Sequence, residues 1–224
     1  MERLAFKNAD RAQLSLLSSI ERRCLVFLAQ RMPEWVQPDH LTLLGILSML
    51  GAGLAYWYAA RNRTGLVLAT LFLALNWFGD SLDGTLARVR NRQRPRYGFY
   101  VDHVIDSFGA LLLLAGLGLS GYMSPAVAAG LLVAFLILSI EVYLATYTIG
   151  TFHLSHWKFS PTELRLLLMI GNAVLFYRPT VRLFGRSFLL FDVGGVVGIV
   201  GMTLMLFAAV ARHTVFLYRE ERIP

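Results

Sequence analysis

The segment that decides the interpretation of this chain runs from Asp80 to Asp106 and reads DSLDGTLARVRNRQRPRYGFYVDHVID. Its carboxylates fall at helical spacings, because Asp80 and Asp83 are three residues apart and Asp102 and Asp106 are four apart. Residues at these separations share one face of a helix. If the two helical stretches are antiparallel neighbours, as the short connection between them indicates, four carboxylates converge.

The sequence around this segment is that of a membrane protein. Of the 224 residues, 56% are hydrophobic, and the apolar residues are gathered in long runs. Each run is long enough to cross a bilayer, either alone or with its flanking residues. The runs occupy residues 40–60, 64–79, 107–121, 124–148, 164–177 and 189–211. We therefore predict an all-α integral membrane bundle of six transmembrane helices, which forms one domain over residues 39–224.

The N-terminal region, residues 1–38, has a different character. Residues 1–31 are too charged to be a secretory signal. A helix over residues 11–31 would carry an apolar face made of Leu14, Leu17, Cys24, Leu25 and Leu28. This pattern predicts an amphipathic helix that lies in the membrane interface, and a helix packed on the transmembrane helices is the alternative.

The distribution of basic residues predicts the orientation in the membrane. The net charge is +7, and with six spans most Lys and Arg fall on the side of the N-terminus. The other side keeps Arg61, Arg63, Arg178, Arg182 and Arg186. The positive-inside rule then places both termini and the carboxylates at the cytoplasmic face of the cell (inner) membrane. We interpret the arginines after Arg88 as this topological signal, with binding of an anionic lipid as an alternative. The membrane setting argues against nucleic-acid binding.

Four carboxylates beside bilayer sequence require compensation. One charge near the bilayer centre costs about 2.5–3.5 kcal/mol on insertion scales. Ligand sets made only of oxygen favour hard cations such as Mg²⁺ or Mn²⁺, and four carboxylates can hold two of them. Two such metal ions can bind phosphate oxygens and stabilise the attacking and leaving groups of phosphoryl transfer. The segment therefore predicts a metal site with phosphate chemistry.

The residues between the carboxylates support phosphate chemistry. Gly84 and Gly98 leave room for a diphosphate near the backbone, and Arg88 can pair bidentately with a phosphate. A cation or proton transporter is the alternative from another class, because intramembrane acids also mark ion paths. Transport sites tend towards the bilayer midplane. The acids of this chain lie towards one face and beside an arginine, which favours the phosphate interpretation.

The pattern D-x-x-D-G-x-x-A-R, followed after nine residues by G-x-x-x-D-x-x-x-D, resembles the signature of the CDP-alcohol phosphatidyltransferase family at every fixed position. The resemblance covers most of the chain, since the family core also has six transmembrane helices, often after an interfacial helix. It implies an enzyme that joins a CDP-activated group to an alcohol and releases CMP. Its product would be a phospholipid, and it would work in the bilayer as a homodimer.

The resemblance also implies roles for individual residues. Two divalent ions would be bound by Asp80, Asp83, Asp102 and Asp106, and Asp106 would also be the catalytic base that deprotonates the acceptor hydroxyl. The CDP site would be formed by Gly84, Ala87, Arg88 and Gly98. Residues 38–42, Pro-Asp-His-Leu-Thr, match a Pro-Asp-x-x-Thr motif that touches the nucleotide in the family, which adds Asp39 and Thr42 to that site.

The resemblance leaves the substrates open. Ser107 follows Asp106 where members that use inositol phosphate often carry Arg, which disfavours that acceptor. The order Asp102-His103-x-x-Asp106-Ser107 is similar to that of choline and ethanolamine phosphotransferases, which use a CDP-aminoalcohol and diacylglycerol. This chain lacks the extra helices of those enzymes. We therefore place CDP-diacylglycerol first as donor, with a small alcohol as acceptor, and the aminoalcohol reaction second.

Three further charged residues have two interpretations each. Glu141 lies well inside an apolar run, where it can hydrogen-bond within the bundle or line the acceptor pocket. Glu163 and Arg165 lie near the start of another run, where they can shape the acceptor site or form a helix-end charge pair. The single cysteine, Cys24, excludes an internal disulfide and any metal site built from cysteines.

Overall fold

The computed structural model describes residues 18–149 and 161–221. The described part contains seven helices and one antiparallel hairpin, so the predicted all-α class is confirmed with a small addition. In chain order the elements are α1 (Ser18–Arg31), α2 (Pro38–Ala59), α3 (Thr64–Val89), α4 (Pro95–Gly118), α5 (Pro125–Ile149), α6 (Pro161–Tyr177), β1 (Thr180–Leu183), β2 (Arg186–Leu189) and α7 (Leu190–Glu220).

Five of these helices, namely α2, α3, α4, α5 and α7, are long and apolar enough to cross a membrane. The sixth expected span falls on α6, which has 17 residues. A helix of that length rises about 25 Å, less than the roughly 30 Å of a hydrocarbon core. It ends at Tyr177 because Pro179, the second residue beyond it, cannot continue a helix. The described residues thus contain five membrane-length helices where six were expected.

Proline sets where the helices begin. Four of them have proline in the first turn, where the missing N–H leaves no hydrogen bond unmade. These prolines are Pro38, Pro95, Pro125 and Pro161. The predicted apolar runs at 124–148 and 164–177 thus correspond to α5 and α6, and residues 150–160 between them lie outside the described residues. Between α3 and α4 the chain reverses at Asn91, whose φ is 53°.

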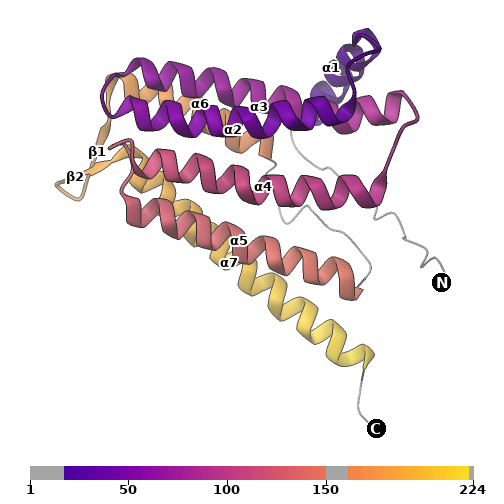
Figure 1. Ribbon diagram of the computed structural model, residues 1–224. Helices are drawn as coiled ribbons and strands as arrows, with labels where there is room; N and C mark the ends of the chain where they lie inside the picture. Colours follow the sequence, from indigo (N-terminus) through magenta and orange to yellow (C-terminus); the bar gives the residue numbers. More distant parts are fainter. Residues whose placement is uncertain (1–17, 150–160, 222–224) are drawn as a thin grey trace.

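The helices pack as a bundle around α2 and α3 (Figure 1). α2 contacts α3 and α4, α3 also contacts α1 and α6, and α5 joins α4 to α7. Two glycines let α2 and α4 approach each other closely. A Cβ on Gly116 would collide with the backbone of Gly53, and a Cβ on Gly53 would collide with that of Leu112. Small residues commonly permit such close contacts between helices in membranes.

Helix α1 packs on α3 near the C-terminal end of α3 (Figure 1). Leu25 and Ala29 are 7% and 2% exposed and belong to a cluster with Leu82 and Leu86 of α3. Cys24, which we expected on the same apolar face, is exposed and does not belong to this cluster. The other expected members, residues 14 and 17, lie outside the described residues. The described part of α1 therefore packs on a membrane-length helix through Leu25 and Ala29.

Candidate active site

A pocket opens between α2, α3, α4 and α6, at the end of the bundle where α3 ends and the other three helices begin. All four carboxylates of the segment face it, because α3 and α4 are antiparallel neighbours joined by a short turn. Its lining consists of Thr42, Gly45, Met49, Asn76, Asp80, Asp83, Asp102, Ile105, Asp106, Gly109 and Arg165. Of the expected site residues, the structure thus brings together the four carboxylates and Thr42.

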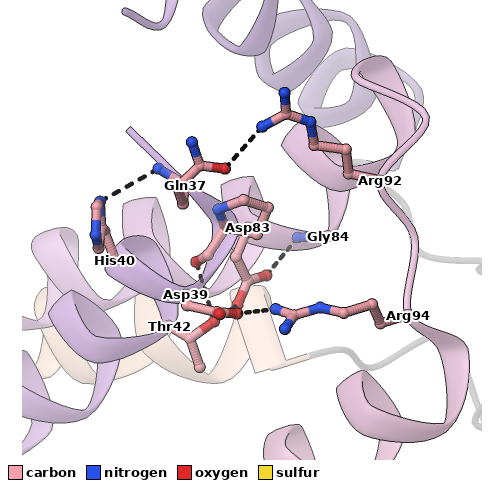
Figure 2. Close-up of polar contacts among 9 residues, drawn as sticks. Gln37, Asp39, His40, Thr42, Asp83, Gly84, Arg92 and Arg94 are labelled. Carbon is pink, nitrogen blue, oxygen red and sulfur yellow. Dashed lines mark hydrogen bonds and ion pairs between the residues drawn. The ribbon is translucent and has the colours of Figure 1, made fainter. Parts of the chain in front are cut away.

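Asp83 is held by hydrogen bonds to both of its oxygens. Thr42 Oγ1 of α2 donates to Asp83 Oδ2 at 2.7 Å, and the backbone N–H of Gly84 donates to Asp83 Oδ1 at 2.5 Å (Figure 2). The Pro-Asp-x-x-Thr motif at the start of α2 is therefore tied directly to the carboxylate segment on α3. This contact joins two stretches that the sequence analysis had connected only by resemblance.

Asp80 is paired with a buried arginine. Arg165 of α6 is 8% exposed, and its Nη2 lies 2.6 Å from Asp80 Oδ2. A buried guanidinium is strongly destabilising without a partner, so this ion pair fixes how α6 sits against α3. Arg165 therefore does not simply form a charge pair at the end of its own helix. Its side chain lines the pocket and pairs with a residue of another helix.

The chemistry of the pocket fits hard cations. The pocket contains four carboxylates and one guanidinium, which leaves an excess of three negative charges when all are ionised. Each carboxylate would bind a metal ion through oxygen. Within the described ranges, no three Asp, Glu, His or Cys side chains surround one point closely enough to hold an ion as they stand. As the side chains stand, Asp83 accepts a hydrogen bond from Thr42 and Asp80 is paired with Arg165. The donor set therefore fits Mg²⁺ or Mn²⁺ once these carboxylates rotate.

The other expected CDP contacts lie outside the pocket lining, on the turns of α3 and α4 nearest to the connecting loop. Arg88 is exposed and its Nη2 donates to Thr85 Oγ1 at 3.0 Å. A Cβ on Gly98 would meet no atom within 4 Å, and a Cβ on Gly84 would meet only the Arg88 guanidinium, at 3.5 Å or more. Helix packing thus does not require glycine at either position, in contrast to Gly53. The space left open beside them is available to a ligand.

Comparison with known proteins shows the family of this chain. Residues 35–208 match the family described as CDP-alcohol phosphatidyltransferase. The chain belongs to this family. It is therefore a multi-pass membrane enzyme of a phospholipid-synthesising transferase family, and the transporter alternative is set aside.

Two curated proteins are similar to parts of the transferase. An uncharacterized protein of Aquifex aeolicus (strain VF5) is 32% identical over 146 residues, which cover 62% of this chain and 69% of that protein. The archaetidylinositol phosphate synthase of Pyrococcus horikoshii (strain ATCC 700860 / DSM 12428 / JCM 9974 / NBRC 100139 / OT-3) is 34% identical over 86 residues. That match covers 38% of this chain and 43% of the synthase.

The arginines after Arg88 have a structural role in the transferase that the sequence analysis missed. Arg90, Arg92 and Arg94 clasp the linker between α1 and α2 together with the first turn of α2. Arg92 donates to Gln37 Oε1 at 3.1 Å, and Arg94 pairs with Asp39 of that turn (Figure 2). Arg90 donates to main-chain carbonyls of the same linker, namely those of Met32, Pro33, Glu34 and Val36. No local pattern reveals such contacts, because the acceptors are mostly backbone atoms more than 50 residues earlier in the chain. Asp39, an expected CDP contact, is half exposed and engaged by this clasp.

The floor of the transferase pocket contains residues that were not singled out. Asn76 lies one helical turn before Asp80 on the same face of α3, and Met49 and Gly109 lie beside it on α2 and α4. The spacing of Asn76 from Asp80 was a usable signal. Glu141 is not part of this lining and instead lies 2.6 Å from His213 Nδ1 of α7, so the interpretation as a hydrogen bond within the bundle holds.

Proposed function

We propose that this transferase moves a phosphatidyl group from a CDP-linked lipid, with CDP-diacylglycerol as first choice, to a small alcohol and releases CMP. The observation that carries the proposal is the convergence of Asp80, Asp83, Asp102 and Asp106 on one pocket of a family member. No other described group of side chains combines carboxylates, a buried guanidinium and open space in this way.

The proposed metal ligands are these four carboxylates. Two Mg²⁺ or Mn²⁺ ions held there would neutralise phosphate charge and stabilise the oxygen that leaves with CMP. Asp83 would give up its Thr42 hydrogen bond, and Asp80 its Arg165 pair, to serve as ligands. Thr42 and Arg165 would then be free to contact the substrates, so the pocket exchanges internal contacts for ligand contacts.

Asp106 is the proposed catalytic base. It is exposed towards the pocket and lies one turn deeper than Asp102. From there it can hold the acceptor hydroxyl beside the phosphorus that bears the lipid. The acceptor oxygen forms a bond to that phosphorus, the bond from phosphorus to the CMP oxygen breaks, and the hydroxyl proton passes to the Asp106 carboxylate. Positioning of the hydroxyl contributes as much as proton transfer.

The nucleotide of the donor would lie at the mouth of the pocket, against Gly84, Ala87, Arg88 and Gly98. The space open beside the two glycines and the exposed guanidinium of Arg88 support this placement. Thr42 lies next to the same region, because it donates a hydrogen bond to Asp83, the residue before Gly84. Asp39 can take part only if it exchanges Arg94 for the nucleotide or acts through that ion pair.

One relative favours a small-alcohol acceptor over the aminoalcohol reaction. The Pyrococcus protein is named as archaetidylinositol phosphate synthase, and that name contains inositol phosphate and no aminoalcohol. That name also points to an anionic acceptor, and the buried Arg165 in the pocket wall gives such an acceptor a counter-charge. Ser107 after Asp106 remains the feature that argues against inositol phosphate itself.

We also propose a six-span bundle in which α6 is the fifth span, with both termini and the pocket at the cytoplasmic face of the cell membrane and with two copies forming a homodimer. The distribution of arginines supports this orientation. The pocket end carries residues 88–96, whereas the hairpin lies at the other end with Arg182 and Arg186 (Figure 1).

One assay tests the proposed reaction. Purified full-length protein is incubated with CDP-diacylglycerol, Mg²⁺ or Mn²⁺ and a panel of small alcohols, and CMP release is measured. A parallel reaction contains CDP-choline and diacylglycerol. Release of CMP that depends on both CDP-diacylglycerol and an alcohol supports the proposal. Release only from CDP-choline would assign the aminoalcohol reaction instead.

A further inference from the structure

Two asparagines are buried in the bundle, and their hydrogen bonds differ. Asn76 of α3 is 5% exposed and Asn172 of α6 is 2% exposed. Both polar atoms of the Asn172 amide have partners, because its Oδ1 accepts from the Tyr56 hydroxyl at 2.8 Å and its Nδ2 donates to Thr70 Oγ1 at 3.0 Å. Asn76 Nδ2 donates to the Gly45 carbonyl at 2.9 Å, but its Oδ1 is buried without a partner among the described residues.

The unpartnered oxygen calls for an explanation, since buried polar atoms in proteins almost always have hydrogen-bond partners. The amide cannot be reversed to remove the problem, because its oxygen would then face the Gly45 carbonyl oxygen. Asn76 lines the pocket, and its neighbours at the floor, Met49 and Gly109, offer no donating side chain. The missing donor is therefore expected from a molecule that enters the pocket.

The direction of the proposed reaction indicates which molecule that is. Phosphoryl transfer places the attacking and leaving oxygens on opposite sides of the phosphorus. If CMP leaves towards the mouth, beside Gly84 and Arg88, the alcohol attacks from the floor. Asn76 lies on that side, one helical turn deeper than Asp80. The acyl chains of the donor carry no hydrogen-bond donor, so the acceptor alcohol is the partner that fits.

We infer that Asn76 is a specificity-determining residue whose Oδ1 accepts a hydrogen bond from a non-reacting hydroxyl or amino group of the acceptor alcohol. The inference rests on the proposed function, because it requires the acceptor to enter this pocket. A buried amide oxygen left without a donor penalises acceptors that lack such a group. Asn76 therefore selects alcohols with a second donor over simple monohydric alcohols.

The test compares the two buried asparagines in the full-length protein. Asn76→Leu removes the acceptor oxygen at similar size, and Asn172→Leu is the matched control. CMP release is measured against acceptor concentration and separately against CDP-diacylglycerol concentration, with L-serine, glycerol 3-phosphate and myo-inositol 3-phosphate as acceptor probes. Thermal unfolding is recorded for each variant. Asn76→Ala repeats the measurement in case the leucine variant does not fold.

We expect Asn76→Leu to lower kcat/KM for the acceptor by about tenfold or more while the KM for the donor stays nearly constant. Asn172→Leu should lower the unfolding temperature and leave the acceptor kcat/KM unchanged. In the unaltered protein, an acceptor analogue without its non-reacting donors should lose a similar factor, and Asn76→Leu should add little to that loss.

Two outcomes would overturn the inference by different routes. If the unaltered protein releases CMP but the Asn76 variants and the analogue leave the acceptor kcat/KM unchanged, Asn76 does not read the acceptor and the proposed function stands. If the unaltered protein releases no CMP from CDP-linked donors with these probes, the proposed function fails and the inference fails with it.

Discussion

Arg165 and Asp80 are 85 residues apart in the sequence, yet Arg165 Nη2 lies 2.6 Å from Asp80 Oδ2 in the pocket wall. The guanidinium occupies the position of a counter-charge beside a proposed metal ligand. Asp80 cannot pair fully with Arg165 and also bind an ion, so arginine and metal compete for the same carboxylate. This competition gives Arg165 opposite effects on metal binding and on turnover.

Arg165→Gln should therefore bind Mn²⁺ more tightly and turn over more slowly. Removal of the guanidinium frees Asp80 and removes a positive charge beside the ions. The gain in Mn²⁺ affinity should be roughly threefold to tenfold, because Asp80 is partly exposed and solvent screens the pair. Free Mn²⁺ is measured by electron paramagnetic resonance, and CMP release is measured in parallel. A variant with weaker Mn²⁺ binding would show that Arg165 only supports the fold of the pocket.

Removal of the metal should abolish transfer reversibly. The pocket has an excess of negative charge that only cations can neutralise during attack on a charged diphosphate. EDTA should stop CMP release, and Mg²⁺ or Mn²⁺ should restore it. Binding is followed independently, with two Mn²⁺ ions expected per chain and fewer in Asp102→Asn. Full turnover in excess EDTA would exclude the two-metal proposal.

Convergence of the carboxylates was predictable because it follows from local geometry. Spacings of three and four residues on two helices joined by a short turn are enough to bring Asp80 and Asp106 to one pocket. The starts of α5 and α6 were predictable for a similar reason, since a proline at the first position marks them within a few residues.

The features that escaped prediction depend on distant partners or on unusual turn chemistry. Nothing around Arg90 shows that it will bind carbonyls of residues 32–36. The hairpin after α6 turns at Phe184 and Gly185, both with positive φ, and lacks the Asn-Gly or Asp-Gly pair that normally marks such turns. The run at residues 164–177 was already short, and α6 ends at Tyr177 before Pro179, which is why six apolar runs gave five described helices of membrane length.

Substitution of Arg88 should affect ligand binding, whereas substitution of Arg90 should affect stability. Arg88 is exposed at the mouth of the pocket, whereas Arg90 holds the linker between α1 and α2. Arg88→Ala should weaken CDP binding about tenfold or more, the loss expected for a charge-assisted contact to phosphate, and should lower the unfolding temperature less than Arg90→Ala does. Arg90→Ala should lower stability by about 1–3 kcal/mol, because several carbonyls lose their donor.

Calorimetric titration with CDP and thermal unfolding check this pair of variants, each serving as the control for the other. Equal CDP affinity in Arg88→Ala and the unaltered protein would reassign Arg88 to the surface of α3. An unchanged unfolding temperature in Arg90→Ala would mean that the linker holds its place without the clasp.

Asp106→Asn should separate the chemical step from donor binding. The substitution preserves size and one ligand oxygen but removes the charge that accepts the proton of the acceptor hydroxyl. Asp80, Asp83 and Asp102 can still hold at least one ion, so the donor should bind nearly as before. We expect turnover to fall by about 10²-fold or more, the range typical of a lost general base.

Asp192→Asn is the matched control, because Asp192 lies on α7 and its Oδ1 accepts the backbone N–H of Ser124, away from the pocket lining. That control should keep nearly full turnover even if its unfolding temperature drops.

CMP release is measured at saturating donor and acceptor, and donor affinity is measured by calorimetry with CDP-diacylglycerol in detergent. A near-normal rate for Asp106→Asn would exclude Asp106 as the base. Loss of donor binding together with turnover would instead make Asp106 chiefly a metal ligand, with the hydroxyl activated by the ions alone.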